Sequence, residues 1–109
     1  MVKFDNTFPN NPIKIGQNAL ENDNIIGLAK ETDIWFHLKA LPSCHLIISN
    51  SKEYPITGDM ITFCAKLVKA NTKYRNYAKL KVIYTEIKNV KKTDVAGKVI
   101  VKKEKNIVV

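Results

Sequence analysis

Seven consecutive residues, DIWFHLK from Asp33 to Lys39, constrain the fold of this chain more than any other segment. One set of alternate positions is apolar (Ile34, Phe36 and Leu38), and the other holds Asp33, Trp35, His37 and Lys39. A period of two is that of a β-strand, whose successive side chains point to opposite faces of a sheet. The segment therefore predicts a strand with one face in a hydrophobic core.

Other segments predict strands because β-branched and aromatic residues are bounded there by turn-forming residues. Strands are expected at residues 12–15, 25–29, 45–49 and 80–87, with turns at 16–18, 22–24 and 41–43. Residues 16–18 can begin a short helix instead of a turn. Residues 99–109 hold two apolar runs around Lys102–Lys105, which predicts a C-terminal hairpin. Residues 1–11 are expected to form a loose N-terminal lead-in.

The hydrophobic period changes between Thr57 and Asn71. Met60, Phe63, Cys64, Leu67 and Val68 follow the i, i+3, i+4, i+7, i+8 spacing of a helix with one buried stripe. Thr57 suits the N-cap position and Asp59 the first turn. One principal helix (about 57–71) with about six strands, mainly antiparallel, predicts an α+β fold. The chain of 109 residues is expected to be a single domain over 1–109, since a second would have too little core.

The charge of the chain favours a polyanionic partner. Eighteen basic residues against ten acidic ones give a net charge of +8, which speeds encounters with nucleic acid. Nine of the basic residues lie within residues 79–109: Lys79, Lys81, Lys88, Lys91, Lys92, Lys98, Lys102, Lys103 and Lys105. We expect Lys88, Lys91 and Lys92 to contact phosphates, which positions a backbone without reading bases. The alternative is a lysine-rich surface that serves only solubility.

The row Trp35, His37 and Lys39 admits two interpretations. If its face is open, Trp35 can stack on an unpaired base and Lys39 can meet a phosphate. If the helix at 57–71 covers this face, Trp35 belongs to the core and His37 makes a structural hydrogen bond. We expect Trp35 to be largely structural, with His37 and Lys39 bordering a nucleic-acid-binding surface.

No pattern in the chain indicates catalysis, a metal site or a cofactor. Cys44 and Cys64 lie twenty residues apart without the paired spacing of a zinc site. Cys44 and His45 are neighbours on a predicted strand, so they point to opposite faces and cannot act as nucleophile and base. No run of residues has the length of a signal peptide or a membrane span, which predicts a cytoplasmic protein with reduced thiols.

Several stretches, taken in order and spacing, resemble the NFACT-R domain, the RNA-binding module of the NFACT proteins of ribosome quality control, which also occurs alone. They are Ile15–Ala19, Glu21–Asp23, Asp33–His37, Pro42–Ile48, Val82–Thr85, Lys88, Val90–Lys92, Gly97–Val99 and Lys105–Val109. The resemblance covers nearly the whole chain from Pro12. It departs from the family at Ser43 and Cys44, where Gly and Ser are usual, and at Gln17, where a basic residue is usual. The helix at 57–71 is also bulkier than in the family, and the loop at 93–96 is shorter.

The resemblance implies a domain that is not an enzyme and that binds transfer RNA or ribosomal RNA. The larger NFACT proteins add an N-terminal domain pair and a coiled coil, so their tail-elongating activity is not expected of this chain. The RNA-binding residues that we expect are Asn18, Asn22, Asp23, Asp33, Trp35, His37, Lys39, His45, Lys88, Lys91 and Lys92. We also expect the ribosome and its associated proteins as partners, and we expect no interaction with a membrane.

Two alternatives remain open. The chain can instead be a protein-facing accessory subunit of a tRNA-modification or ribosome-rescue complex, which an exposed apolar patch would favour. It can also be a nucleotide-processing enzyme, which would require Asp23, His37 and His45 to converge in one cleft.

Overall fold

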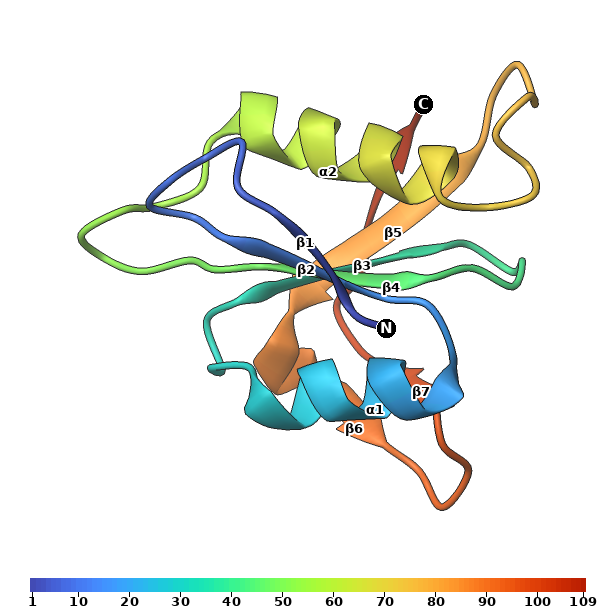
Figure 1. Ribbon diagram of the computed structural model, residues 1–109, viewed down its shortest axis with the longest axis horizontal. Helices are drawn as coiled ribbons and strands as arrows, with labels where there is room; N and C mark the ends of the chain where they lie inside the picture. The colour runs from blue at the N-terminus through green and yellow to red at the C-terminus, as the bar shows by residue number, and fades with distance from the viewer.

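Two helices lie on opposite faces of an antiparallel sheet, as Figure 1 shows for the computed structural model, which describes residues 1–109. The strands are β1 (Lys3–Asp5), β2 (Ile13–Gly16), β3 (Ile34–Leu38), β4 (His45–Ile48), β5 (Lys81–Glu86), β6 (Val90–Lys92), β7 (Val99–Val101) and β8 (Lys105–Val108). The helices are α1 (Ala19–Leu28), α2 (Gly58–Ala70) and the short 3-10 helix η1 (Ile87–Asn89). Six strands form one sheet in the order β1-β2-β4-β3-β5-β8, and β6 pairs with β7 separately. The predicted α+β class is confirmed.

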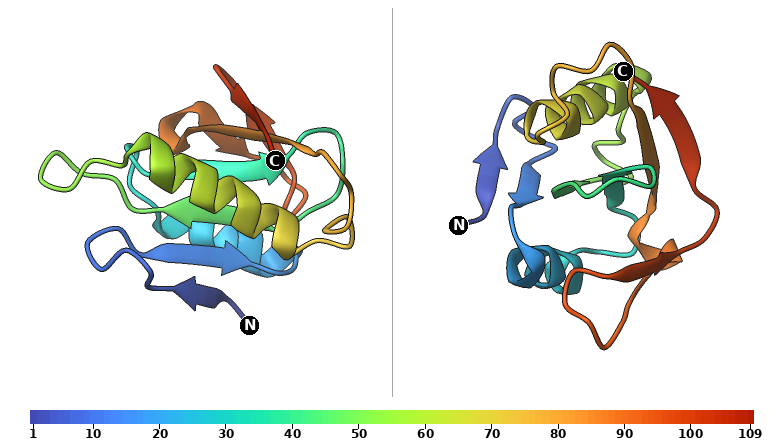
Figure 2. Two further views of the ribbon diagram at one scale, coloured as in Figure 1. Left: turned by 90° about the horizontal axis from the view of Figure 1, so that it is seen from above. Right: turned by 90° about the vertical axis from the view of Figure 1, so that its right-hand side faces the viewer.

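The predicted alternation along β3 is confirmed, and it divides the interior into two cores. Ile34, Phe36 and Leu38 lie in the larger core, beneath α2. Trp35 lies in a smaller core on the other face of the sheet, with Ile25 and Ile26 of α1. The sheet is therefore the middle layer of three, with α2 at one end and α1 beside β7 at the other (Figure 2).

Helix α2 forms where the sequence predicts it. The Thr57 hydroxyl accepts a hydrogen bond from the Met60 N–H at 3.3 Å, and Asn71 ends the helix. Cys64 and Val68 are fully buried against the sheet, while Phe63 is partly buried at its edge. Neither helix is long and apolar enough to cross a membrane.

The predicted strand at residues 25–29, with the turn at 22–24, is wrong, because these residues belong to α1. The usual amphipathic pattern is weak here: Ile25 and Ile26 are buried, but so is Asn22, whereas Leu20 and Leu28 are 75% and 69% exposed. The helix is defined instead by its N-cap, since the Asn18 side chain accepts from the Glu21 N–H at 2.9 Å. Of the two alternatives at 16–18, the helical one is nearer the structure.

Of the two interpretations of the Trp35 face, the covered one is nearer the structure, but α2 is not the element that covers it. That face is covered by α1 and by the β6–β7 ribbon, whose Val90, Val99 and Val101 pack against the smaller core. The loop of the ribbon approaches α1 closely, since a Cβ built on Gly97 would lie 3.0 Å from the Ala19 Cα. Gly97 also has a φ of +80°, so glycine is required there on two grounds.

The two chain ends differ from expectation as well. Residues 1–11 are not a loose lead-in throughout, because β1 pairs with β2 and Asn11 is buried. The predicted C-terminal hairpin is wrong, because β7 pairs with β6 whereas β8 pairs with β5. The physical reason is that the two apolar runs face different cores: Val99 packs against the smaller core, and Ile107 packs against the larger one.

Trp35 is 1% exposed, and its replacement by alanine tests the structural role of the smaller core. We expect Trp35→Ala to lower the free energy of unfolding by about 3–5 kcal/mol, because a large cavity opens. Urea denaturation measures this change. Phe4→Ala is the matched control, since Phe4 is 65% exposed and its loss costs less than about 1 kcal/mol. A loss for Trp35→Ala as small as that of the control would contradict the assignment.

Candidate nucleic-acid interface

A cleft of about 810 Å³ opens between the start of α1, the ends of β3 and β4, and the loop that joins β6 to β7. Five residues predicted from the sequence to bind RNA line this cleft: Asn18, Asn22, Trp35, His37 and His45. These residues come from α1 with its N-cap, from β3 and from β4, and the antiparallel pairing of β3 with β4 brings the end of β3 next to the start of β4. The structure thus brings these five residues together, and RNA binding by them stays a prediction.

A buried hydrogen bond orders the floor of the cleft. The Trp35 Nε1–H donates to His45 Nδ1 at 3.1 Å, and His45 is only 3% exposed. The ring of His37 stacks parallel to the Trp35 indole, with ring centres 5.7 Å apart. His45 meets both rings edge-on, with its centre 4.8 Å from that of His37. Trp35 is thereby held in the core, so it is not free to stack on a base.

Both histidines are neutral at physiological pH. Burial, together with the proximity of His37, lowers the pKa of His45 to about 3, against a smaller opposite effect of Asp23. Burial also lowers the pKa of His37, although its hydrogen bond to the Leu38 carbonyl opposes this. The His37 Nδ1 atom lies 2.6 Å from that carbonyl oxygen, which can only accept, so Nδ1 carries the proton. The structural hydrogen bond expected for His37 is thus present in a side chain that also borders the cleft.

The start of α1 forms one wall of the cleft. The Asn22 side chain accepts from the His45 N–H at 3.3 Å and so joins α1 to β4. Gly16 makes this approach possible, since a Cβ there would lie 2.2 Å from Asn22 Oδ1. The Glu21 carboxylate accepts from the Gln17 N–H at 3.1 Å and pairs with the ammonium of Met1. The helix N-terminus is therefore already occupied by an acidic side chain.

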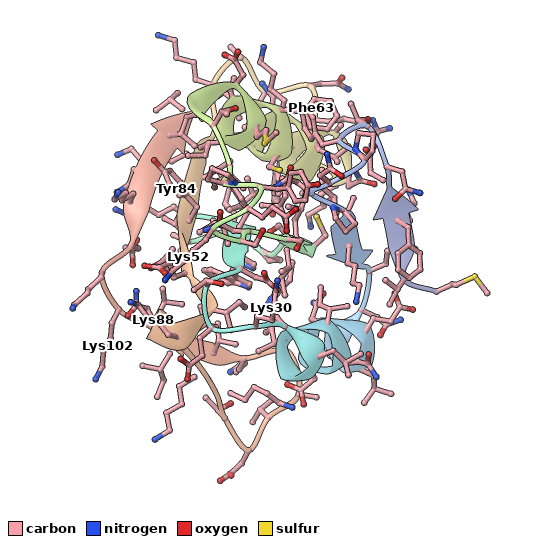
Figure 3. The ribbon with its side chains drawn as sticks, turned by 90° about the vertical axis from the view of Figure 1, so that its left-hand side faces the viewer. Lys30, Lys52, Phe63, Tyr84, Lys88 and Lys102 are labelled. Atoms are coloured by element: carbon pink, nitrogen blue, oxygen red, sulfur yellow. The ribbon has the colours of Figure 1, made fainter.

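A second hollow, a groove of about 610 Å³, runs beside η1 and β6. Four exposed lysines line it: Lys88, Lys91, Lys92 and Lys102. Figure 3 shows Lys88 and Lys102 next to each other at one edge of the molecule. The sequence predicted the first three as phosphate contacts, and the pairing of β6 with β7 adds the fourth.

Strand β7 separates the cleft from the groove. Val99 and Val101 line the cleft, whereas Ile100 and Lys102 line the groove. This division follows from the period of two along a strand. A single chain of nucleotides can therefore reach both hollows by crossing one short ribbon.

The remaining predicted residues lie outside both hollows. Asp23 pairs through Oδ2 with Lys92 at 3.5 Å, and its Oδ1 is buried without a hydrogen-bond partner. Asp33 is buried and accepts from the backbone N–H groups of Lys30 and Asn50 at 2.9 and 3.1 Å, which fixes the start of β3. Lys39 is exposed just beyond β3. The structure thus gives Asp33 a scaffolding role at the start of β3, where the sequence also allowed one.

The three residues that a nucleotide-processing enzyme would bring together, Asp23, His37 and His45, do not all line the cleft. Asp23 is not among the residues that line it with His37 and His45. Burial raises the pKa of Cys44 to about 11 and that of Cys64 to about 12, so both thiols stay protonated at neutral pH. No three His, Cys, Asp or Glu side chains lie where they can hold a metal ion.

Sequence reasoning missed the part of the site that comes from the β6–β7 loop. Gly97 and Lys98 close one side of the cleft, and Ile100 forms part of the groove. From the sequence, Lys98 is recognised only as one member of a basic cluster. A period of two over residues 99–102 places alternate side chains on two faces of a strand. The predicted C-terminal hairpin assigned these residues to a different strand pairing, so the two faces were not recognised.

Comparison with known proteins places this architecture among described relatives. The family model for the NFACT protein RNA-binding domain matches residues 1–104. Coiled-coil domain-containing protein 25 of Bos taurus is 35% identical over 88 residues, covering 74% of this chain and 41% of that protein. The Rqc2 homolog RqcH of Streptococcus suis is 30% identical over 81 residues, covering 73% of this chain and 14% of that protein.

A solved structure shows the same fold. It is the C-terminal part of the fibronectin/fibrinogen-binding protein from Streptococcus suis, with a TM-score of 0.86 and 26% sequence identity. The match covers 99% of this chain and 44% of that one. The chain thus spans less than half the length of each of these three relatives.

The lowered pKa of His45 predicts a pH-dependent stability. Below about pH 6.5 His45 is protonated in the unfolded chain, whereas in the folded protein it stays neutral down to about pH 3. The free energy of unfolding therefore falls as the pH falls through this window. The contribution is at most about 1.4 kcal/mol per pH unit. Urea denaturation between pH 7 and pH 4 measures it.

His45→Asn is the matched variant for this measurement. The asparagine Oδ1 can take the place of Nδ1 as acceptor for Trp35, but it does not titrate. We expect the variant to be less stable at pH 7 and to lose less stability on acidification. Parallel pH profiles for the two proteins would exclude His45 as the titrating group.

Proposed function

The chain belongs to the NFACT protein RNA-binding domain family, and from that premise we propose that it binds structured RNA of the translation machinery through the lysine groove. The lysine groove is the hollow lined by Lys88, Lys91, Lys92 and Lys102. RNA binding in ribosome quality control is the role that the family and a relative named as an Rqc2 homolog support. More specifically, we propose that the ligand is transfer RNA or ribosomal RNA and that binding takes place in the cytoplasm.

The convergence of four lysines on one groove is the observation that carries this proposal. Their side chains come from η1, from β6 and from the residue after β7, and all four are exposed. Lysine ammonium groups attract phosphates as point charges and do not discriminate between bases. A groove of this kind supports binding that follows the RNA backbone.

The acidic neighbours of the groove leave it positive. Glu86 lies 3.6 Å from the Lys88 ammonium, and Asp23 lies 3.5 Å from that of Lys92. Lys91 and Lys102 form no ion pair within 4.0 Å, so their charges are free for a ligand. Ile26, Ile87 and Ile100 line the groove between the lysines and give it an apolar surface that sugars can contact.

Charge reversal in the groove tests this function. We expect Lys91→Glu/Lys102→Glu to weaken binding to a tRNA by at least about tenfold near 100 mM salt, because two phosphate contacts become repulsive. The slope of log K against log[salt] should also become shallower, by roughly 1 for each phosphate that is no longer bound. Fluorescence anisotropy across a salt series measures both quantities.

Lys52→Glu/Lys66→Glu serves as the matched control. It makes the same change in net charge at two exposed lysines, one before α2 and one on it. We expect this variant to keep the wild-type salt slope. Equal losses of affinity in the two double variants would mean that net charge, and not the lysine groove, determines binding. Wild-type binding to the tRNA that does not depend on salt would contradict the electrostatic mechanism.

A further inference from the structure

One nitrogen of His45 is left for a ligand. Because Trp35 donates to Nδ1, the proton of the neutral ring resides on Nε2. No hydrogen bond within the protein uses this N–H, since His45 bonds only through Nδ1 and its backbone N–H. Asp23 Oδ1 is the one side-chain nitrogen or oxygen that is fully buried without a hydrogen-bond partner. His45 Nε2 also lacks a partner, so it is not fully buried, and it is open to the cleft that the ring lines. The residue is only 3% exposed but keeps a donor without a partner.

His37 contributes the complementary atom. Its Nδ1–H donates to the Leu38 carbonyl, so the Nε2 of the neutral ring carries a lone pair and accepts. This nitrogen also has no partner within the protein, and the half-buried ring lines the same cleft. The protein's own hydrogen bonds therefore fix opposite tautomers on the two histidines.

We propose that the cleft receives one unpaired nucleobase of the RNA, which accepts a hydrogen bond from His45 Nε2–H and donates one to His37 Nε2. The edge of a nucleobase carries a donor beside an acceptor, and the two imidazole rings, whose centres lie 4.8 Å apart, are close enough to face one base together. The proposal rests on the RNA binding proposed above and adds a base-recognition site to the phosphate groove.

The cleft favours a neutral heterocycle over an anion. The start of α1 already holds the Glu21 carboxylate, which repels a phosphate, and both imidazoles are uncharged. Ile83, Val99 and Val101 supply apolar walls on which a flat base can pack. The volume of about 810 Å³ falls in the range of sites that hold small organic ligands.

Charge is available where the ribose-phosphate of such a nucleotide would emerge. Lys98 is exposed and contributes to the lining of the cleft from the β6–β7 loop. From there the backbone can cross β7, whose other face borders the lysine groove. The route joins the base site to the phosphate contacts on Lys91 and Lys102.

A hairpin RNA with one bulged uridine in its stem is the probe for this site. It is compared with the same hairpin carrying an abasic residue or N3-methyluridine at the bulge, because all three have the same charge. We expect the uridine hairpin to bind about tenfold more tightly than either of the others, as two hydrogen bonds together contribute. N3-methylation removes the donor that faces His37.

Two variants remove the free nitrogens and keep the internal hydrogen bonds. In His45→Asn the new Oδ1 can accept from Trp35, and in His37→Asn the new amide can donate to the Leu38 carbonyl. We expect each variant to bind the uridine hairpin more weakly than the wild type does and to lose the preference for uridine over N3-methyluridine. His37→Asn alters a half-buried side chain, so it tests the proposal even if His45→Asn folds poorly.

The results of these titrations separate the base site from the proposed function. Salt-dependent binding with equal affinity for the uridine and abasic hairpins would overturn the base site and leave the lysine groove in place. Equal affinity for uridine and N3-methyluridine, with weaker abasic binding, would overturn the paired donor and acceptor. A failure of all three hairpins to bind would overturn RNA binding itself.

Discussion

The hydrogen bond from Trp35 to His45 is the interaction on which the rest of the structure depends. It joins β3 to β4 inside the smaller core, between two side chains that are 1% and 3% exposed. An indole N–H buried without a partner would be costly, so this core requires an acceptor at that point. Once His45 accepts, its tautomer is determined, and its backbone N–H is held in turn by Asn22 of α1. One bond thus sets the packing of a helix and the chemistry of a cleft.

The β6–β7 ribbon organises the proposed interface. Its inward valines cover the smaller core, and its outward residues join the lysines of the groove. The ribbon can lie close to α1 because Gly97 has no side chain to meet Ala19. The proposed phosphate contacts and the proposed base site thereby lie on two faces of a three-residue strand, while α2 packs against the opposite face of the sheet.

Prediction from the sequence is correct for the elements with a strong hydrophobic period. It is wrong where tertiary contacts, and not the hydrophobic period, determine the local structure. Strand β3 and helix α2 are correct because Phe36 and Val68 belong to clear periods of two and 3.6. The sequence does not predict helix α1, because this helix exposes Leu20 and buries Asn22. The burial of Asn22 is explained by its hydrogen bond with the backbone of His45, a contact that no sequence pattern shows. The hairpin was wrong because Val99 and Ile107 serve different cores. The sequence predicts His37 and His45 as site residues, but their tautomers depend on hydrogen-bond partners that no sequence pattern shows.

Nitrogen NMR of the histidine and tryptophan rings tests the central claim most directly. We predict that at neutral pH His45 is protonated at Nε2 and bare at Nδ1, whereas His37 is protonated at Nδ1. On addition of the hairpin with a bulged uridine, both ring signals and those of residues 96–102 should shift, while those of α2 should not. A proton on Nδ1 of His45, or shifts confined to α2, would contradict this account.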